Sequence, residues 1–313
     1  MSEHELIVPP VTEENICLPL AVSAVSKYWD VSLPLAEANE IAKKYQNVRG
    51  SILIEGIELA ERHGLGSLIL HSSLPELKKI IDMGIPPIVI LPGLYEVVQH
   101  ASVISGYDQN ENSIIHYMPQ PDQIGMIPQR QFDSLWEEDG RLVILVAPTD
   151  IISAIKVENR NKEKSNRLCF VSEKLNLQGR SEDAIKTLKD AIGLDDTNST
   201  ALCLLGGIYN EKNSPECIQY YEQSIKHNKR CYLAYRGLGN YYLKTKQYDK
   251  ADSYYTEAIK INSTRFGPIY KNRGIARLEL KKTKEAKQDF ENYLKHTPNA
   301  KDKTSILEAI KEL

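Results

Sequence analysis

The rear half of this 313-residue chain repeats with a period near 34 residues. Small residues recur at spacings of 33, 34 and 35, namely Ala184, Cys217, Ala251 and Ala286. A second small set is Ser172, Gly206, Gly239 and Gly274, and large residues keep step with it at Leu188, Tyr221, Tyr255 and Phe290. A fixed period of this length predicts stacked pairs of helices that bury small residues where the helices touch.

The clearest unit spans residues 234–261, with Leu-Gly-x-x-Tyr in its first half and Ala-x-x-x-Tyr-x-x-Ala in its second. This unit resembles a tetratricopeptide repeat. The sequence predicts four such repeats over roughly 165–298, closed by Thr297 and Pro298. Residues 301–313 then read as an amphipathic capping helix. The resemblance implies an all-α solenoid that binds a protein or peptide.

The front half has a different pattern. Helical patterns occupy 17–28, 34–45, 51–63 and 74–82, and short apolar runs occupy 67–71, 86–91, 100–106, 113–117 and 141–146. This order predicts an α+β domain rather than alternating βαβ units. The predicted domains are residues 1–150 and 165–313, and Pro148 with the polar stretch 158–166 marks the join.

Charge divides the chain in the same way. Residues 1–150 carry 9 Lys and Arg against 21 Asp and Glu, whereas residues 151–313 carry 30 against 21. An acidic front half disfavours nucleic acid as a partner. The basic rear half fits acidic partners or its own front half. Helix faces spaced by Lys and Glu and covered by solvent are the favoured explanation.

Targeting and cofactor motifs are not found in the sequence. The N-terminal residues lack the pattern of a secretory signal, and no apolar run reaches the roughly 18 residues of a membrane span. The five cysteines include no Cys-x-x-Cys, which argues against a disulfide framework or a zinc site. We therefore expect a cytoplasmic protein without a metal or other cofactor. The sequence assigns no oligomeric state.

Cys17 and His100 are the candidate reactive residues. Cys17 lies near the start of the helical pattern in 14–29, and His100 opens a predicted strand in 99–108. A thiol at a helix N-terminus that faces an imidazole forms a thiolate nucleophile in cysteine enzymes. Taken singly, Cys17 also fits a small buried residue, and His100 fits a strand histidine satisfied by the core.

The phrases around these residues resemble the C39-like cysteine peptidases, the papain-fold domains that cleave double-glycine leader peptides. The resemblance covers about residues 8–148. It rests on Gly-Ser-Ile-Leu-Ile-Glu-Gly-Ile-Glu-Leu-Ala (50–60), on 74–91, on Phe-x-x-x-Trp within 131–136 and above all on His-Ala-Ser-Val-Ile-Ser-Gly-Tyr-Asp (100–108). It implies a papain-like fold in which Cys17 is the nucleophile and His100 the general base.

Three positions depart from that family's pattern. Val11 stands where the family places an oxyanion-hole Gln, and the loss of one such donor typically lowers the rate by about 10²–10³. Met118, before Pro119, stands where the family places the Asp that orients the imidazole, and Leu18 replaces a Gly. Nearby polar residues offer substitutes for the missing groups, namely Glu13, Glu14, Asn15, Gln99, Gln120 and Asp122.

Three functions follow from this resemblance. The first is a thiol peptidase whose repeats recruit a protein substrate. The second is a catalytically inactive pseudopeptidase that binds an extended peptide and acts as an adaptor. The third is acyl transfer through a thioester at Cys17, which uses the same pair of residues.

The repeats contain a second candidate site on their first helices. Arg236 and Asn240 lie in the third repeat, and Lys271 and Asn272 lie in the fourth. Arg236, Asn240 and Asn272 fall where some tetratricopeptide domains hold a partner's C-terminal carboxylate. Cationic and amide donors suit a carboxylate. Ordinary surface polarity is the alternative explanation. Lys301 and Lys303 of the capping helix occupy the next position of the pattern.

Overall fold

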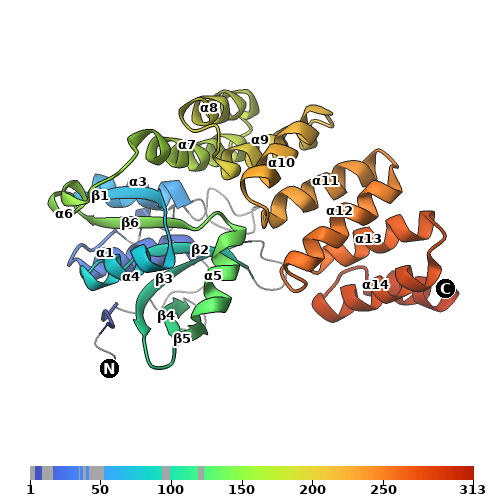
Figure 1. Ribbon diagram of the computed structural model, residues 1–313, viewed down its shortest axis with the longest axis horizontal. Coiled ribbons are helices and arrows are strands. Elements are labelled where there is room, and N and C mark those ends of the chain that lie inside the picture. Colours follow the sequence, from blue (N-terminus) through green and yellow to red (C-terminus); the bar gives the residue numbers. More distant parts are fainter. Residues whose placement is uncertain are drawn as a thin grey trace. The chain divides into compact units, whose positions relative to one another are not determined.

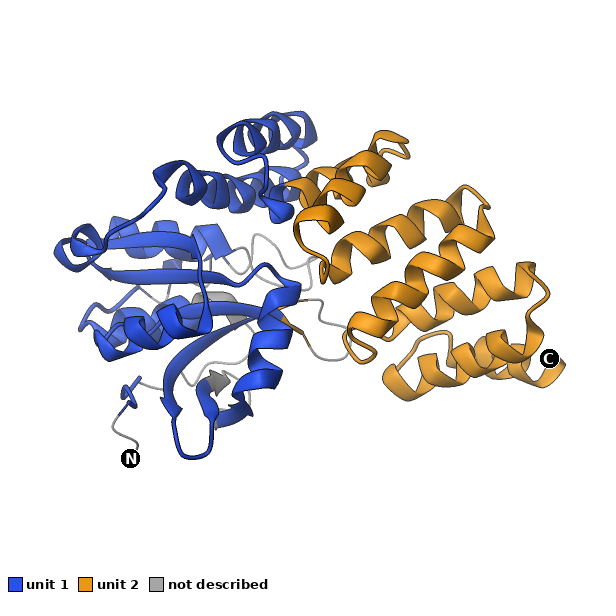
Figure 2. Ribbon diagram, in the orientation of Figure 1, with its two compact units in different colours: residues 1–91, 100–201 blue, residues 92–99, 202–313 orange. Residues whose placement is uncertain are grey.

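The computed structural model describes residues 4–8, 17–34, 36–37, 40–41, 53–93, 99–118 and 123–313. The chain divides into two compact units, residues 1–91 with 100–201 and residues 92–99 with 202–313 (Figure 2). The predicted domain limits, 1–150 and 165–313, stay a prediction.

The first unit is built on one six-stranded sheet in the order β1-β6-β2-β3-β4-β5 (Figure 1). The strands are β1 (Leu65–His71), β2 (Ile88–Pro92), β3 (Gln99–Asp108), β4 (Ser113–Met118), β5 (Gln123–Pro128) and β6 (Leu142–Pro148). The pairs β1–β6, β2–β6, β3–β4 and β4–β5 are antiparallel. An N-terminal α+β region with an antiparallel sheet is therefore confirmed.

Helices cover both faces of this sheet. They are α1 (Cys17–Tyr28), α3 (Leu53–Arg62), α4 (Leu74–Asp82), α5 (Gln129–Glu138) and α6 (Thr149–Ala154). On β6, Ile144 packs in the core shared with α1 and α3, and Val143 packs in the core shared with α4 and α5. Both are fully buried. Since successive strand residues point to opposite faces, a strand buried on both faces reads as a continuous apolar run.

Most predicted elements of this unit are present. The predicted helices 17–28, 51–63 and 74–82 correspond to α1, α3 and α4, and each of the five predicted strands has a counterpart. The predicted helix 34–45 lies largely outside the described residues. The sequence did not predict β5 or α6. Gly125 and the terminal Pro128 make β5 unlike a strand, because both residues are disfavoured in strand interiors.

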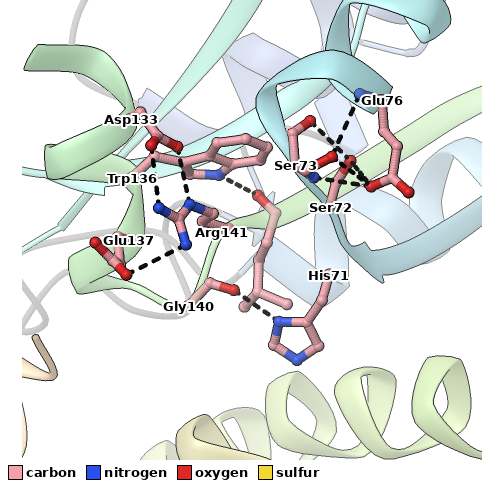
Figure 3. A network of polar contacts seen from close by, with 10 residues as sticks. His71, Ser72, Ser73, Glu76, Asp133, Trp136, Glu137, Gly140 and Arg141 are labelled. Carbon is pink, nitrogen blue, oxygen red and sulfur yellow. Dashed lines mark hydrogen bonds and ion pairs between the residues drawn. The ribbon is translucent and has the colours of Figure 1, made fainter. Parts of the chain in front are cut away.

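A polar network fixes the ends of α4 and α5 (Figure 3). The Ser73 hydroxyl accepts from the Glu76 amide, and the Glu76 carboxylate accepts from the Ser73 amide, which together form a capping box. After α5, Arg141 has a φ of +51°. Its guanidinium donates to both carboxylate oxygens of Asp133 at 2.9 and 3.1 Å. This bidentate pair holds the turn that leads into β6.

The N-terminal segment 4–8 crosses β3 at a bulge. Glu5 forms an isolated antiparallel bridge with Gly106, and a Cβ at Gly106 would lie 2.5 Å from the His4 carbonyl oxygen. The close approach requires glycine at this position. His4 stacks on Tyr107, with ring centroids 4.3 Å apart, and its Nδ1 lies 2.8 Å from Asp82 Oδ1.

Helix pairs occupy the rest of the chain. They are α7 (Arg160–Leu177), α8 (Ser181–Leu194), α9 (Ser199–Glu211), α10 (Glu216–His227), α11 (Tyr232–Lys244), α12 (Tyr248–Ile261), α13 (Pro268–Glu279), α14 (Thr283–His296) and α15 (Lys303–Glu312). A Cβ at Gly239 would lie 2.6 Å from the Tyr255 ring. A Cβ at Gly274 would lie 2.8 Å from the Phe290 ring. The predicted placement of small residues where the helices touch is confirmed at these positions, and the region is TPR-like.

Helix α7 packs beside β1 and α3 of the first unit. The stretch 158–166, which the sequence marks as the join between the predicted domains, contains the N-cap Asn159 and the first turns of α7. Asn166 Nδ2 donates to the Ile69 carbonyl at 3.1 Å. The Arg167 guanidinium donates to both Glu61 oxygens at 2.9 and 2.7 Å. Asn166 thus satisfies a backbone carbonyl of β1, and Arg167, the next residue, pairs with Glu61 on α3. These bonds hold the polar start of α7 against β1 and α3.

Glu173 on α7 gives the protein an expected pH dependence. Burial raises the pKa of its carboxyl to about 7, compared with about 4.3 in an unfolded chain. The unfolded state therefore loses its proton first as the pH rises. The free energy of unfolding should fall between about pH 4.3 and 7, by at most about 1.4 kcal/mol per pH unit. Glu173→Gln should remove this fall, so that the variant is the more stable protein above pH 7.

Urea denaturation at several pH values measures this effect. The matched control is Glu182→Gln on α8, where the side chain is exposed and the profile should follow the wild type. If the free energy of unfolding changed with pH in the same way in wild type and in Glu173→Gln, the expected effect of burial would be contradicted.

Among the described residues, no helix is long and apolar enough to cross a membrane.

Candidate functional sites

The first candidate site is the region of Cys17 and His100. Helix α1 begins at Cys17, as the sequence predicts. The side chain of Cys17 lies outside the described residues, as do Val11, Glu13, Glu14 and Asn15. The distance between its sulfur and His100 is therefore not part of the described structure, and the pairing stays a prediction.

The groups proposed to orient the imidazole follow β4. Met118 is the last residue of β4, and its backbone pairs with Gln123 on β5. The Met118 side chain, Pro119, Gln120 and Asp122 lie outside the described residues. Gln99 opens β3 beside His100, and its side chain is exposed.

His100 is half-buried on β3. Burial lowers the pKa of its imidazole below the ordinary value. A neighbouring carboxylate would shift the pKa in the opposite direction. In the described part of the chain, no Asp or Glu makes a hydrogen bond or ion pair with His100. The burial of His100 favours the neutral imidazole.

A second imidazole lies close to His100. His116 on β4 is buried, and its Nδ1 lies 3.1 Å from the Ser102 hydroxyl oxygen on β3. Burial, and then the charge of nearby His100, lower the pKa of His116 to about 4. His116 pairs with Gly125 on β5, where a Cβ would lie 3.0 Å from His116 Nε2. The glycine leaves room for this ring.

The sequence did not single out Ser102 or His116. Alternation along β3 places residues 100 and 102 on one face, but the position of 116 depends on the pairing of β3 with β4. That pairing contains a bulge between Ile104 and Gly106, which shifts the register by one residue. The sequence signal that could have identified His116 was its position two residues before Met118.

The second candidate site lies on the second unit. Asn240 and Asn272 come together, because Asn272 Nδ2 donates to Asn240 Oδ1 at 3.3 Å. Tyr255, which the sequence assigned only to packing, donates its hydroxyl to the same oxygen at 2.8 Å. Arg236 lies in the same neighbourhood and contributes to the electrostatic environment of Tyr255.

Lys271 is held by the segment before α15. Its Nζ lies 2.8 Å from Asp302 Oδ2, and the Tyr293 hydroxyl donates to the other Asp302 oxygen at 2.7 Å. These two bonds, that of Lys271 first, lower the pKa of the Asp302 carboxyl. Lys271 is therefore neutralised within the protein, unlike Arg236.

Arg236 is half-buried on α11, and part of its guanidinium has no partner. Its Nε and Nη1 atoms are buried and have no hydrogen-bond partner within the described ranges. The guanidinium carbon lies 4.7 Å from the centre of the Phe266 ring. Burial, with a further contribution from nearby Arg265, lowers the pKa of Arg236. In the part of the chain that the structure describes, no group of three or more His, Cys, Asp or Glu residues is placed to hold a metal ion.

The chain is similar to several known proteins. It is 34% identical over 95 residues to anaphase-promoting complex subunit 3 of Schizosaccharomyces pombe, which is 30% of this chain and 14% of that protein. The chain thus spans about a seventh of this curated relative.

Solved structures of similar shape include a Pseudomonas aeruginosa PilF structure, with 20% identity and a TM-score of 0.43 over 49% of this chain and 68% of that one. The peptidase domain of Streptococcus ComA has 21% identity and a TM-score of 0.38, over 47% of this chain and 100% of that one. MamA of Desulfovibrio magneticus has 15% identity and a TM-score of 0.42, over 48% of this chain and 93% of that one.

The tetratricopeptide repeat family model matches residues 232–265, which hold helices α11 and α12. The second half of this chain therefore contains a tetratricopeptide repeat, a structure that implies interaction with other proteins.

Proposed function

We propose that this protein is a peptide-binding adaptor. Its front region, residues 1–150, is a C39-like, papain-fold domain derived from a cysteine peptidase, and its repeats recruit a protein partner. The sequence phrases around Cys17 and His100 and the α+β architecture support the first part. The tetratricopeptide repeat supports the second. The free, buried cysteines at 169, 203, 217 and 231 agree with the reducing cytoplasm that we propose as its location.

The environment of His100 is the observation that best supports the adaptor function. A thiolate at Cys17 would need a protonated imidazole beside it. Burial disfavours a positive charge at His100. No carboxylate among the described residues compensates for this. Under these conditions Cys17 stays a thiol, and the front domain binds an extended peptide without cutting it.

A thiol peptidase is the second candidate function, and one observation favours it. Cys17 lies at the first position of α1, where the helix dipole and free backbone amides stabilise a thiolate. The Cys17 amide would supply half of an oxyanion hole. Acyl transfer through a thioester at Cys17 would use the same groups.

Alkylation of Cys17 with iodoacetamide across pH 5–10 separates these functions. The adaptor predicts a pKa near the ordinary value of about 8.5, unchanged in His100→Ala. A pKa well below 7 that rises in His100→Ala would instead establish an activated nucleophile and overturn the adaptor.

Two controls make the measurement specific. Cys17→Ser gives the background from the other four cysteines, which are buried. His227→Ala removes an exposed histidine from α10 and should leave the labelling profile of Cys17 unchanged.

A further inference from the structure

The turn between the two helices of each repeat contains a residue in the left-handed backbone region. These residues are Gly179, Asn213, Lys246 and Lys281, with φ between +55° and +77°. They recur at spacings of 34, 33 and 35. Glycine and asparagine are the residues that this region favours, whereas a long side chain is strained there. The geometry of the turn therefore does not account for lysine at two successive positions.

Side-chain contacts place the turns of the second unit next to one another along one edge (Figure 1). Lys282, between α13 and α14, has its Nζ 2.8 Å from Asp252 Oδ2 near the start of α12. Lys244, at the end of α11, donates to the carbonyl of Asn210 near the end of α9, at 3.3 Å. The turns α9–α10, α11–α12 and α13–α14 are thus neighbours.

Lysine dominates two of these turns. We call residues 244–250 and 281–287 together the lysine edge. The two segments contain seven lysines against one Asp and one Glu, and all of these lysines except Lys287 are exposed. Within the part of the chain that the structure describes, only Lys282 among them forms an ion pair, with Asp252. Most of the positive charge on the lysine edge is therefore not neutralised by the protein.

The charged groups beneath the lysine edge supply no spare carboxylate. Asp252 binds both Arg277 and Lys282 at 2.8 Å. Asp289 binds Arg273 at 2.6 Å and Arg277 at 2.9 Å. Three cations thus share two carboxylates, and this network itself keeps a net positive charge. Charges at a protein surface act over about 8 Å at physiological ionic strength, so lysines of adjoining turns attract an anionic ligand together.

We propose that the lysine edge binds an acidic segment, a short run of Asp and Glu residues, in the partner protein that the repeats recruit. Ammonium groups attract carboxylates and raise the rate at which oppositely charged partners associate. Nucleic acid fits less well, because Arg273 and Arg277 already bind carboxylates within the protein and the whole chain carries a net charge of −3. The inference rests on the proposed role of the repeats in recruitment, and it names the chemistry of the segment they recognise.

Fluorescence anisotropy of a labelled hexaglutamate peptide, titrated with the full chain, tests the proposal. We expect saturable binding that weakens as the concentration of sodium chloride rises, and no binding of a labelled hexaglutamine peptide. Equal binding of the two peptides, or no binding of hexaglutamate at low salt, overturns the proposal. Tighter binding of an oligothymidylate of equal charge would assign the edge to nucleic acid and overturn it as well.

One double variant separates binding from folding. Lys246→Gly with Lys281→Gly removes two charges and places glycine in the left-handed region, where it is favoured. The unfolding midpoint should therefore not fall, while the affinity for hexaglutamate should fall by about 3- to 10-fold. Lys284→Gln, within helix α14, removes one charge without a change of backbone conformation and should weaken binding in the same direction. Unchanged affinity in both variants would contradict the proposal.

A second double variant controls for general positive charge. Lys229→Gln with Lys311→Gln removes the same charge from exposed positions between α10 and α11 and on α15. It should leave the affinity for hexaglutamate unchanged, and a loss equal to that of the glycine variant would show that no specific edge is involved. The Cys17 labelling profile reports separately on the proposed function of the front domain.

Discussion

Asp289→Ala is expected to lower the free energy of unfolding of the second unit by about 3–5 kcal/mol. The Asp289 side chain is 1% exposed and binds two arginines. Arg273 donates to its two oxygens at 3.0 and 2.6 Å, and Arg277 donates at 2.9 Å. Alanine at 289 would leave both guanidinium groups without this carboxylate. Removing one partner of a buried charged network is costly, because the remaining charges cannot recover their hydration.

Arg277 retains one carboxylate after this change. Its Nε donates to Asp252 at 2.8 Å, and Lys282 binds the other oxygen of Asp252 at 2.8 Å. The loss of stability in Asp289→Ala should therefore be greatest around Arg273. Amide hydrogen exchange in α13 and α14, measured in increasing urea, shows which residues lose protection.

The matched control for Asp289→Ala is Glu291→Ala, two residues along α14 on its exposed face. That variant should change the free energy of unfolding by less than about 0.5 kcal/mol. Asp289→Asn, which keeps the shape but not the charge, should fall between the two. Equal stability of Asp289→Ala and Glu291→Ala would show that the buried network contributes nothing to the fold.

The repeat region could be predicted from the sequence because its contacts are local and periodic. Gly239 meets Tyr255 and Gly274 meets Phe290 within one helix pair. Each partner is 16 residues away, so a single period places both residues in register. The contact of Lys271 with Asp302 was not predictable in this way, because it joins a repeat to the capping helix across 31 residues.

The α+β region was predictable in its elements and not in its contacts. Apolar runs indicated β3 and β4, but the bulge after Ile104 determines which residues of β4 lie beside Ser102. The pair of Ser102 and His116 depends on that register. Likewise, the polarity of 158–166 gave no sign of the helix that begins there, whose next turn Asn166 and Arg167 bind to β1 and α3. Tertiary contacts outweigh local polarity at this position.

In the candidate sites, too, part of the arrangement was predictable from the sequence and part depends on three-dimensional packing. Asn240 and Asn272 were predicted together, and the structure brings them together. Arg236 was predicted as a ligand residue because of its position in the repeat. Its lack of partners depends on the packing of Phe266, which lies 30 residues away in the loop before α13. An unsatisfied donor is a property of packing in three dimensions, so a linear pattern cannot reveal it.

Trp136→Ala is expected to lower the free energy of unfolding of the first unit by about 3–5 kcal/mol. Trp136 on α5 is fully buried, and its ring centroid lies 5.4 Å from that of Phe132. Its indole Nε1 donates to the Leu142 carbonyl at 2.8 Å, which ties α5 to the start of β6 (Figure 3). Alanine would leave a cavity in the core that α4 and α5 share with the sheet, and an unpaired buried carbonyl.

The variant provides its own reporter for this effect. The chain has two tryptophans, so Trp29 becomes the only one after the substitution. Trp29 donates to the Val146 carbonyl at 3.0 Å and packs against the cores on both faces of the sheet. Its fluorescence in urea therefore follows the unfolding of the same unit. Arg130→Ala, on the exposed face of α5, should unfold with the wild type. A cavity of this size in a shared core should destabilise every element that lines it. If the urea midpoint reported by Trp29 is the same in Trp136→Ala as in the wild type, α5 does not unfold together with the sheet and the prediction is wrong.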